Sequence, residues 1–147
     1  MAEGLVAGLE HEFAFVVPQS KVVAGLYPES AEFGVMPPVF ATGFLVGLLE
    51  WTCVRAILPY LDWPREQTVG TRVDISHQAP TPAGMTVTCR VRLVSVEGRR
   101  LRFDVAADDG VDVIGEGTHE RVIIDAGRFT ARALAKGKPA ERCGDLG

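Results

Sequence analysis

The sequence predicts an α+β fold in which an antiparallel β-sheet wraps around one long central α-helix. Three observations lead to this prediction: an almost wholly apolar segment of helical length at Ala41–Leu61, one strand-like segment before it, and several strand-like segments separated by turn signals after it. A helix without a polar face must be covered on several sides, and a sheet, alone or with a partner subunit, supplies that cover.

The first expected element is a strand at His11–Val17, where HEFAFVV alternates and is followed by Pro18. An irregular stretch then occupies 18–38. Ordered loops of this length are uncommon in compact domains and often serve as lids or binding loops. We therefore expect a lid-like loop at 18–38, with a short helix around Lys21–Leu26.

The central helix is expected from about Phe40 to Tyr60. Pro37–Pro38 lie just before it, and the hydroxyl of Thr42 lies where it can cap free backbone N–H groups. Pro59 should end or kink the helix, because proline lacks the N–H group and clashes with the preceding turn.

The segment Ala41–Leu61 is also long enough to raise the question of a membrane span. Glu50, Arg55 and Pro59 interrupt it, and the rest of the chain has strand patterns. The sequence therefore favours a buried core helix, and we expect no membrane partner.

The second half of the chain reads as strands joined by turns. The expected strands are Val69–Ala79, Met85–Leu93, Leu101–Ala107 and Asp112–Asp125. The alternation breaks after Leu93, which indicates a β-bulge. The stretches EGRR and DDG are turn signals. Residues 127–147 carry several basic side chains and are expected to form a C-terminal helix or a tail.

Composition narrows the classes of function. The 147 residues suit a single domain spanning 1–147, and the net charge of −4 gives no support for nucleic-acid binding. The start of the chain does not resemble a signal peptide, so a cytoplasmic protein is expected. The three cysteines are widely spaced and show no ligand cluster, so we expect neither a metal nor another cofactor.

Glu50 is the first candidate for chemistry. Its helical neighbours three and four residues away offer no countercharge. A carboxylate in such surroundings is costly to bury, and such groups are candidate bases or nucleophiles. The alternative, that Glu50 marks a solvent-facing stripe, does not also account for Arg55, which lies on another side of the helix.

Two histidines are candidate acid–base groups. His77 continues the face of the strand that holds Val73 and Ile75, so it is either a histidine satisfied in the core or a general acid/base. His119 is its rival, with the same strand parity as Arg121. Thr42 is most simply a helix cap, and becomes a nucleophile or oxyanion donor only if a base lies within reach.

Gly70 and Arg121 also admit two interpretations each. Gly70 either relaxes the start of a strand or presents its N–H to a carbonyl oxygen. Arg121 is either a surface charge or a group that reaches a phosphate or gates a site.

Four stretches make the chain resemble the fluoroacetyl-CoA thioesterase family, a branch of the hot-dog-fold thioesterases: LYPES, PPVFATGFLVGLLEW followed by CVRA, SVEGRR and DGVDVIGEGTHERVII. The resemblance spans about 13–129. It implies that Thr42, Glu50 and His77 match the catalytic trio of the family, and that Gly70 and Arg121 match its substrate-site glycine and arginine.

The resemblance also implies that Val23, Leu26 and Phe33 belong to the loop that covers the acyl pocket. The sequence departs from the family at Met36, where the fluoroacetyl-specific member has a second lid phenylalanine. Methionine is flexible, so it closes a pocket less rigidly than an aromatic ring. Selection for fluorine is therefore less secure than thioester hydrolysis.

The function expected from the sequence is hydrolysis of a short acyl-CoA, fluoroacetyl-CoA or a related small ester, by a homodimer with sites at or near its interface. CoA would be part of the substrate and not a cofactor. The alternatives are a broader acyl-CoA thioesterase, a hydratase of the same fold and a non-catalytic acyl-CoA-binding protein. One geometric difficulty remains, because Thr42 and Glu50 would lie about 12 Å apart along one continuous helix.

Overall fold

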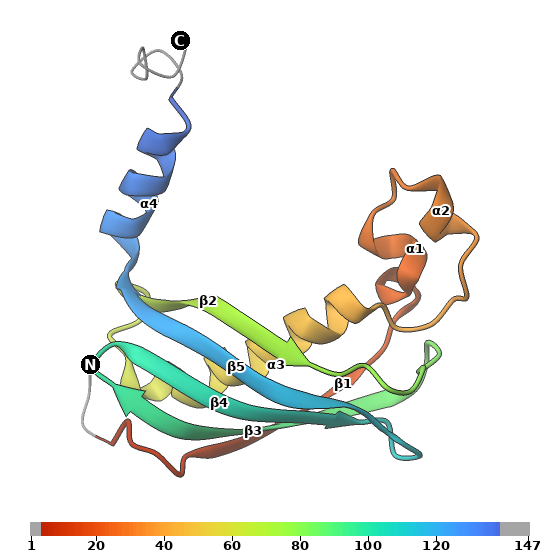
Figure 1. The fold of residues 1–147 in the computed structure, drawn as a ribbon, viewed down its shortest axis with the longest axis horizontal. Coiled ribbons are helices and arrows are strands. Elements are labelled where there is room, and N and C mark those ends of the chain that lie inside the picture. The colour runs from red at the N-terminus through yellow and green to blue at the C-terminus, as the bar shows by residue number, and fades with distance from the viewer. Residues whose placement is uncertain (1–3, 139–147) are drawn as a thin grey trace.

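The computed structural model describes residues 4–138 and confirms the α+β hot-dog architecture. A curved five-stranded antiparallel sheet, in the order β1-β3-β4-β5-β2, wraps around the long helix α3 (Figure 1). The sheet strands are β1 (Glu10–Val16), β2 (Glu66–Ile75), β3 (Thr86–Glu97), β4 (Arg100–Asp108) and β5 (Val113–Asp125). β1 and β2 are the two edges, so the middle of the sheet is built from the β3–β4–β5 meander.

The lid-like loop contains more helix than the sequence indicates. A 3₁₀ turn at Gln19–Lys21 leads into α1 (Val23–Leu26), and a second short helix, α2, follows at Ala31–Gly34. The hydroxyl of Ser30 accepts a hydrogen bond from the N–H of Phe33 and so caps α2. The two helices project from the body of the molecule at one end of α3 (Figure 1).

The central helix α3 runs from Thr42 to Ile57 and continues as a 3₁₀ turn, Leu58–Tyr60, so the α-helix ends just before Pro59, as expected. By length and composition Thr42–Tyr60 could cross a membrane, but 39% of its most apolar window is buried inside the molecule. The helix turns one face toward the sheet, where these residues are buried: Leu45, Leu48, Leu49, Thr52, Cys53, Ala56 and Ile57. α3 is therefore the core helix of the fold.

Thr42 does not cap α3, so this prediction is wrong. The N-cap residue is Ala41, which makes no side-chain capping hydrogen bond, and Thr42 is the first helical residue. Its hydroxyl is therefore available for another partner.

The register of the sheet confirms one predicted irregularity and adds another. The β3–β4 pairing shifts between Leu93 and Ser95, where the sequence indicated a bulge. The β2–β5 pairing shifts between Gly70 and Arg72, which the sequence did not indicate. β2 also begins earlier than expected and ends at Ile75, so the chain after it is a loop.

The C-terminal segment begins with the helix α4 (Ala126–Lys136), which extends away from the sheet (Figure 1). The carboxylate of Asp125 accepts a hydrogen bond from the N–H of Arg128 and caps it. Residues 139–147, with Cys143, lie outside the described part of the chain. Cys53 and Cys89 are both buried, and burial raises the pKa of the Cys89 thiol to about 11.

Candidate active site

The start of α3 and the loop after β2 bring Thr42 and His77 together. The Oγ1 atom of Thr42 lies 2.7 Å from Nδ1 of His77. The sequence predicted His77 on the strand, and this prediction is wrong: β2 ends at Ile75, and His77 lies in the loop that follows. The loop is held on both sides of the histidine, because the N–H of Ser76 donates to Glu116 and the N–H of Gln78 donates to Ile114. The pair is thus fixed by two segments that are far apart in the sequence.

A cavity of about 290 Å³ opens beside this pair. Its lining includes both residues of the pair and the lid residue Val23, together with Phe40 and Ala79. The N–H of Val23 donates to the carbonyl of Val39, which ties the lid to the segment just before α3. A hydroxyl and an imidazole at the mouth of a small, mainly apolar cavity suit a small acyl group.

Burial lowers the pKa of His77, so the ring is neutral at neutral pH. A neutral ring whose Nδ1 accepts the hydroxyl proton of Thr42 carries its own proton on Nε2. Nε2 is buried and has no hydrogen-bond partner among residues 4–138. This geometry allows the Thr42 hydroxyl to act as a nucleophile with His77 as its base, and no third, orienting group hydrogen-bonds to the imidazole within the described chain.

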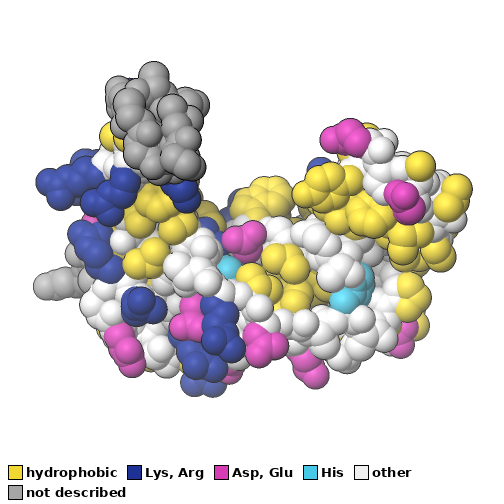
Figure 2. Space-filling model, turned by 45° about the horizontal axis from the view of Figure 1, so that its top comes forward, with side chains coloured by type: hydrophobic (Ala, Val, Ile, Leu, Met, Phe, Trp, Pro, Cys, Tyr) yellow, Lys and Arg dark blue, Asp and Glu magenta, His cyan; other side chains and the backbone are white. Residues whose placement is uncertain are grey.

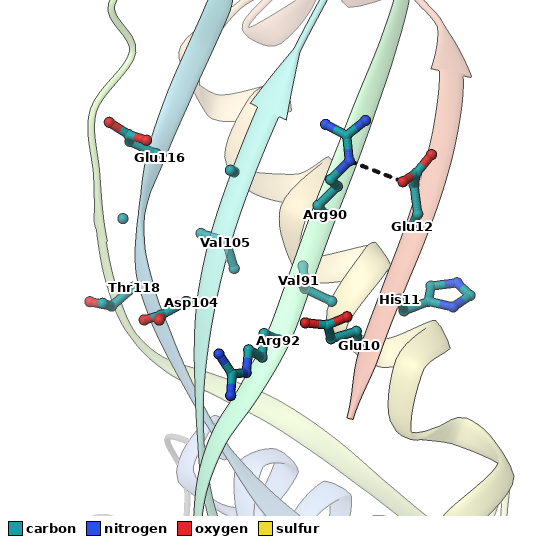
Figure 3. A pocket seen from close by; sticks show the side chains of 12 residues that line it. Glu10, His11, Glu12, Arg90, Val91, Arg92, Asp104, Val105, Glu116 and Thr118 are labelled. Carbon is teal, nitrogen blue, oxygen red and sulfur yellow. Dashed lines mark hydrogen bonds and ion pairs between the residues drawn. The ribbon is translucent and has the colours of Figure 1, made fainter. Parts of the chain in front are cut away.

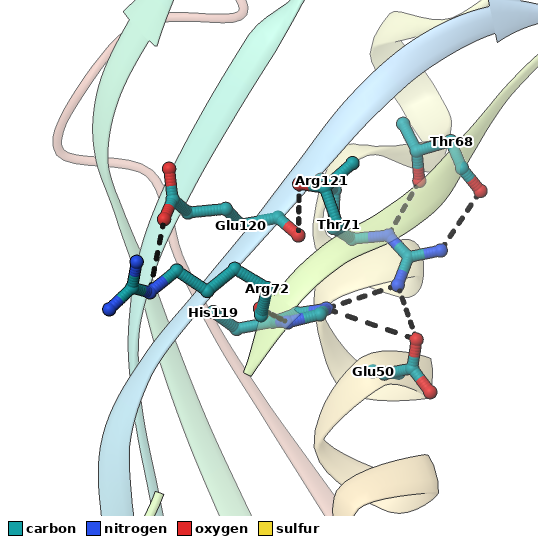
Figure 4. A network of polar contacts seen from close by, with 7 residues as sticks. All are labelled: Glu50, Thr68, Thr71, Arg72, His119, Glu120 and Arg121. Carbon is teal, nitrogen blue, oxygen red and sulfur yellow. Dashed lines mark hydrogen bonds and ion pairs between the residues drawn. The ribbon is translucent and has the colours of Figure 1, made fainter. Parts of the chain in front are cut away.

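A second polar cluster joins the middle of α3 to β5 and β2 (Figure 4). The Nη1 atom of Arg121 donates to Oε1 of Glu50 at 2.9 Å. Its Nε and Nη2 donate to the side chain and the backbone carbonyl of Thr68 at 2.8 and 2.9 Å. Arg121 is therefore held by β2 and in turn holds the carboxylate of Glu50.

This cluster corrects two expectations for Glu50. Arg121 supplies the countercharge that no neighbour on the helix provides, and the Glu50 side chain is 39% exposed. The helical positions around Glu50 could not reveal this partner, because it arrives from a strand 71 residues later. Within one chain, Glu50 is a partly solvated carboxylate positioned by an arginine.

His119 completes this second cluster. It is only 2% exposed, and its Nε2 lies 3.1 Å from Nη1 of Arg121 and 4.0 Å from Oε1 of Glu50. Because Arg121 donates to Nε2, the other ring nitrogen carries the proton and donates to the carbonyl of Arg72 at 2.7 Å. Burial is the main cause that lowers the pKa of His119. In the sequence His119 was only an alternative to His77. Its position two residues before Arg121, on the same face of the strand, was the one sequence feature that indicated this contact.

The absence of a side chain at Gly70 makes room for this cluster. It pairs with Arg121 across the β2–β5 ladder. A Cβ atom at Gly70 would lie 2.8 Å from Oε1 of Glu50 and 3.2 Å from Cε1 of His119. A side chain here would therefore push the Glu50 carboxylate out of its present position, and glycine is the residue that allows this close approach.

The remaining lid residues lie outside the cavity lining. Leu26 packs over the start of α3, where a Cβ atom at Gly43 would lie 3.0 Å from its methyl groups. Phe33 contacts Tyr27 edge to face, with ring centroids 6.2 Å apart. Met36 is 48% exposed. The structure thus brings Val23 to the Thr42–His77 pair and leaves Phe33 and Met36 on the outer part of the lid.

A larger hollow of about 740 Å³ lies on the outer face of the sheet and contains none of the predicted site residues (Figure 3). Within it Arg90 pairs with Glu12 at 3.0 Å, and Arg90 also reaches Asp108 at 2.7 Å outside the lining. In the described part of the chain, no three potential ligand side chains gather as a metal site would require.

Known proteins resemble this chain in sequence. The sequence model of the fluoroacetyl-CoA-specific thioesterase family matches residues 27–127. A fluoroacetyl-CoA thioesterase of Streptantibioticus cattleyicolor is 53% identical over 136 residues, which are 92% of this chain and 97% of the relative.

Two solved structures extend the comparison. A variant of the fluoroacetyl-CoA thioesterase in complex with acetyl-CoA has a TM-score of 0.87 and 52% identity, over 90% of this chain and 98% of that one. A hot-dog-like protein of Thermanaerovibrio acidaminovorans has a TM-score of 0.73 and 22% identity, over 88% of this chain and 91% of that one, and shares the fold. The chain belongs to the fluoroacetyl-CoA-specific thioesterase family and is a thioester hydrolase.

Proposed function

We propose that this chain hydrolyses the thioester of a short acyl-CoA, with fluoroacetyl-CoA as the first candidate, to the free acid and CoA. The observation that carries the proposal is the Thr42–His77 pair, 2.7 Å apart at the mouth of a small cavity beside the lid. The activity of the related thioesterase and the complex with acetyl-CoA support the choice of a small acyl group.

In the proposed reaction, Oγ1 of Thr42 attacks the thioester carbonyl carbon while its proton passes to Nδ1 of His77. The carbon–sulfur bond then breaks, and the CoA thiolate takes the proton from His77. Water then attacks the acyl carbon of the resulting acyl-threonine ester while a base takes its proton. The bond between the acyl carbon and Oγ1 of Thr42 breaks, the proton returns to Oγ1, and the acid is released. The short distance and the lowered pKa of His77 both suit its role as base.

Glu50 is the proposed base for the attacking water. Its carboxylate is partly exposed, so water can reach it, and Arg121 fixes its orientation. The backbone of Gly70 lies beside this carboxylate and is the proposed contact for the carbonyl oxygen. In this account Arg121 is a positioning residue for Glu50.

We propose that the site is completed in a homodimer. Thr42 and Glu50 are about 12 Å apart along α3, so one chain cannot bring them to the same carbonyl. The exposed side of α3 carries Gly43 and Gly47, with Glu50 one turn further on. Two copies of α3 packed antiparallel on this side would place Glu50 of the partner subunit near the Thr42–His77 pair, where Nε2 of His77 has no hydrogen-bond partner among the described residues. The free edge of β2 offers a second pairing surface.

The cytoplasm is the proposed location, because acyl-CoA esters are formed there and the buried Cys53 and Cys89 are free thiols.

A kcat/KM panel of acetyl-, fluoroacetyl-, butyryl- and aryl-CoA tests the proposed function. Glu50→Gln should lower the rate of the preferred ester about 100-fold or more, because proton transfer contributes at least that factor. Full activity in Glu50→Gln would refute the mechanism. Equal rates for acetyl- and fluoroacetyl-CoA would favour the broader thioesterase, which the exposed and flexible Met36 also favours. Addition of water to an enoyl-CoA without hydrolysis of any ester would favour a hydratase.

A further inference from the structure

A basic groove lies where β5 meets α4, at the end of the fold away from the lid. It has a volume of about 490 Å³ and lies between the β3–β4 turn, the end of β5 and one side of α4. Four cationic side chains line it: Arg99, Arg128, Arg132 and Lys136. Asp125 is the single carboxylate among the described residues of its lining.

The cations of α4 are arranged in a stripe. Arg128, Arg132 and Lys136 are four residues apart, so they stack along one side of the helix. Like charges at this spacing destabilise a helix by a few tenths of a kcal/mol per pair. The carboxylate of Asp125 lies at the start of this stripe, where it accepts a hydrogen bond from the N–H of Arg128 and lies 3.7 Å from Arg65. A stripe that is unfavourable by itself suits an anionic ligand.

An apolar surface runs beside the basic stripe. Phe129 and Ala133 each lie one position after an arginine and line the same groove with Ile124. Phe129 is 45% exposed. An aromatic face next to guanidinium groups can stack a purine base while the cations bind phosphates. The groove therefore fits a phosphorylated nucleotide better than a simple inorganic anion.

We propose that this groove binds the phosphates and the adenine nucleotide of the CoA thioester, an assignment that rests on the proposed function. The substrate carries several negative charges, and the groove gathers four cations around one engaged carboxylate. In the proposed homodimer the thioester lies beside Glu50 and Arg121 of the subunit that carries the groove. Asp125 lies four residues after this Arg121 on β5, about 13 Å along the strand, a span suited to the extended pantetheine arm. Figure 2 shows basic side chains gathered around α4 at one end of the molecule, and the lid lies at the opposite end of the same face.

The test compares the double variant Arg128→Gln/Arg132→Gln with wild type. Glutamine has nearly the helix propensity of arginine, so α4 should be retained, and circular dichroism checks this. Arg92→Gln is the matched control, since it removes one exposed arginine from the outer hollow. Calorimetry gives the Kd of CoA and of pantetheine, which lacks the nucleotide, and the same proteins are assayed with fluoroacetyl-CoA and fluoroacetyl-pantetheine.

The double variant should weaken CoA binding about tenfold and leave pantetheine binding unchanged, because two charge contacts are worth that factor together. The KM for fluoroacetyl-CoA should rise in parallel, and added salt should weaken CoA binding to wild type more than to the variant. An unchanged Kd for CoA, or equal losses for CoA and pantetheine, overturns the assignment. If wild type binds CoA through these arginines yet hydrolyses no ester, the proposed function fails while the nucleotide groove stands.

Discussion

Substitution of Gly70 by alanine perturbs the Glu50 cluster with a single methyl group. The new Cβ atom would lie 2.8 Å from Oε1 of Glu50, whereas ordinary contacts begin at 3.4 Å. The carboxylate oxygen must therefore retreat by up to about 0.6 Å, the difference between these distances. If the retreat points away from Arg121, the hydrogen bond of 2.9 Å lengthens to about 3.5 Å, beyond the usual range for N–H···O bonds.

Gly70→Ala should lower the stability of the fold much less than it lowers kcat/KM. The displaced atom is the end of a flexible side chain that is 39% exposed, and the buried Arg121 keeps its two hydrogen bonds to Thr68, so the weakened ion pair should cost about 1 kcal/mol. For a chain of this size that corresponds to a fall in Tm of about 2–4 °C. A misplaced catalytic group is far more costly, and we expect kcat/KM to fall about 10- to 100-fold.

Release of the CoA thiol, followed with a thiol reagent, measures kcat/KM, and thermal unfolding by circular dichroism measures Tm. Gly127→Ala is the control, because its Cβ atom would make only an ordinary contact of 3.5 Å with Asp125. It should leave kcat/KM unchanged and Tm equal or slightly higher. Full kcat/KM in Gly70→Ala, or a loss explained by a fall in Tm of more than about 10 °C, would refute the reasoning.

Four further predictions follow from named contacts. Because hydrolysis needs neutral His77 and burial lowers its pKa, kcat/KM should stay level as pH falls to about 6.5 and decline only below it; a decline beginning near pH 8 would contradict this. The lowered pKa values of His77 and His119 mean that the unfolded chain binds more protons, so the free energy of unfolding in urea should fall as pH drops below about 6.5; a rise there would contradict the burial of these rings. Asp109→Ala removes the acceptor of Thr81 at 2.8 Å and of two backbone N–H groups, so it should cost about 2–3 kcal/mol in urea unfolding; a cost below about 0.5 kcal/mol would contradict it. Met36→Phe should raise the preference for fluoroacetyl- over acetyl-CoA in the kcat/KM panel, since an aromatic ring closes the lid more rigidly; an unchanged ratio would contradict it.

The fold was largely predictable because its signals are local. Alternation marks the strands, one apolar run marks α3, and the break after Leu93 marks the bulge that the register confirms. The second irregularity, at Gly70, was not predictable in this way. It depends on how β2 meets β5 and on the carboxylate that approaches its backbone, and neither is visible in the local pattern.

The pairing of the site residues depended on tertiary contacts that the sequence does not contain. The helical wheel showed Glu50 without a countercharge, because the partner Arg121 reaches it from β5. Thr42 looked like a cap because threonine commonly caps helices, whereas its hydroxyl contacts His77 and leaves the helix end to Ala41. The spacing along the helix indicates that Thr42 and Glu50 of one chain cannot meet. The structure agrees, because Thr42 contacts His77 and Glu50 contacts Arg121 in two separate clusters.

The central claim is that Thr42 and His77 of one subunit act with Glu50 of the other. Heterodimers of Thr42→Ala with Glu50→Gln, isolated with two affinity tags after coexpression, test it directly. A shared arrangement leaves one site with Thr42, His77 and Glu50 all intact, so the heterodimer should show about half the wild-type kcat, although each homodimer is inactive.

The matched control is the heterodimer of Thr42→Ala with His77→Ala, in which both sites stay broken because these two residues belong to the same subunit. The account predicts about half activity in the first heterodimer and none in the second. Absence of activity in the first heterodimer, with Tm close to that of the wild type, would contradict it.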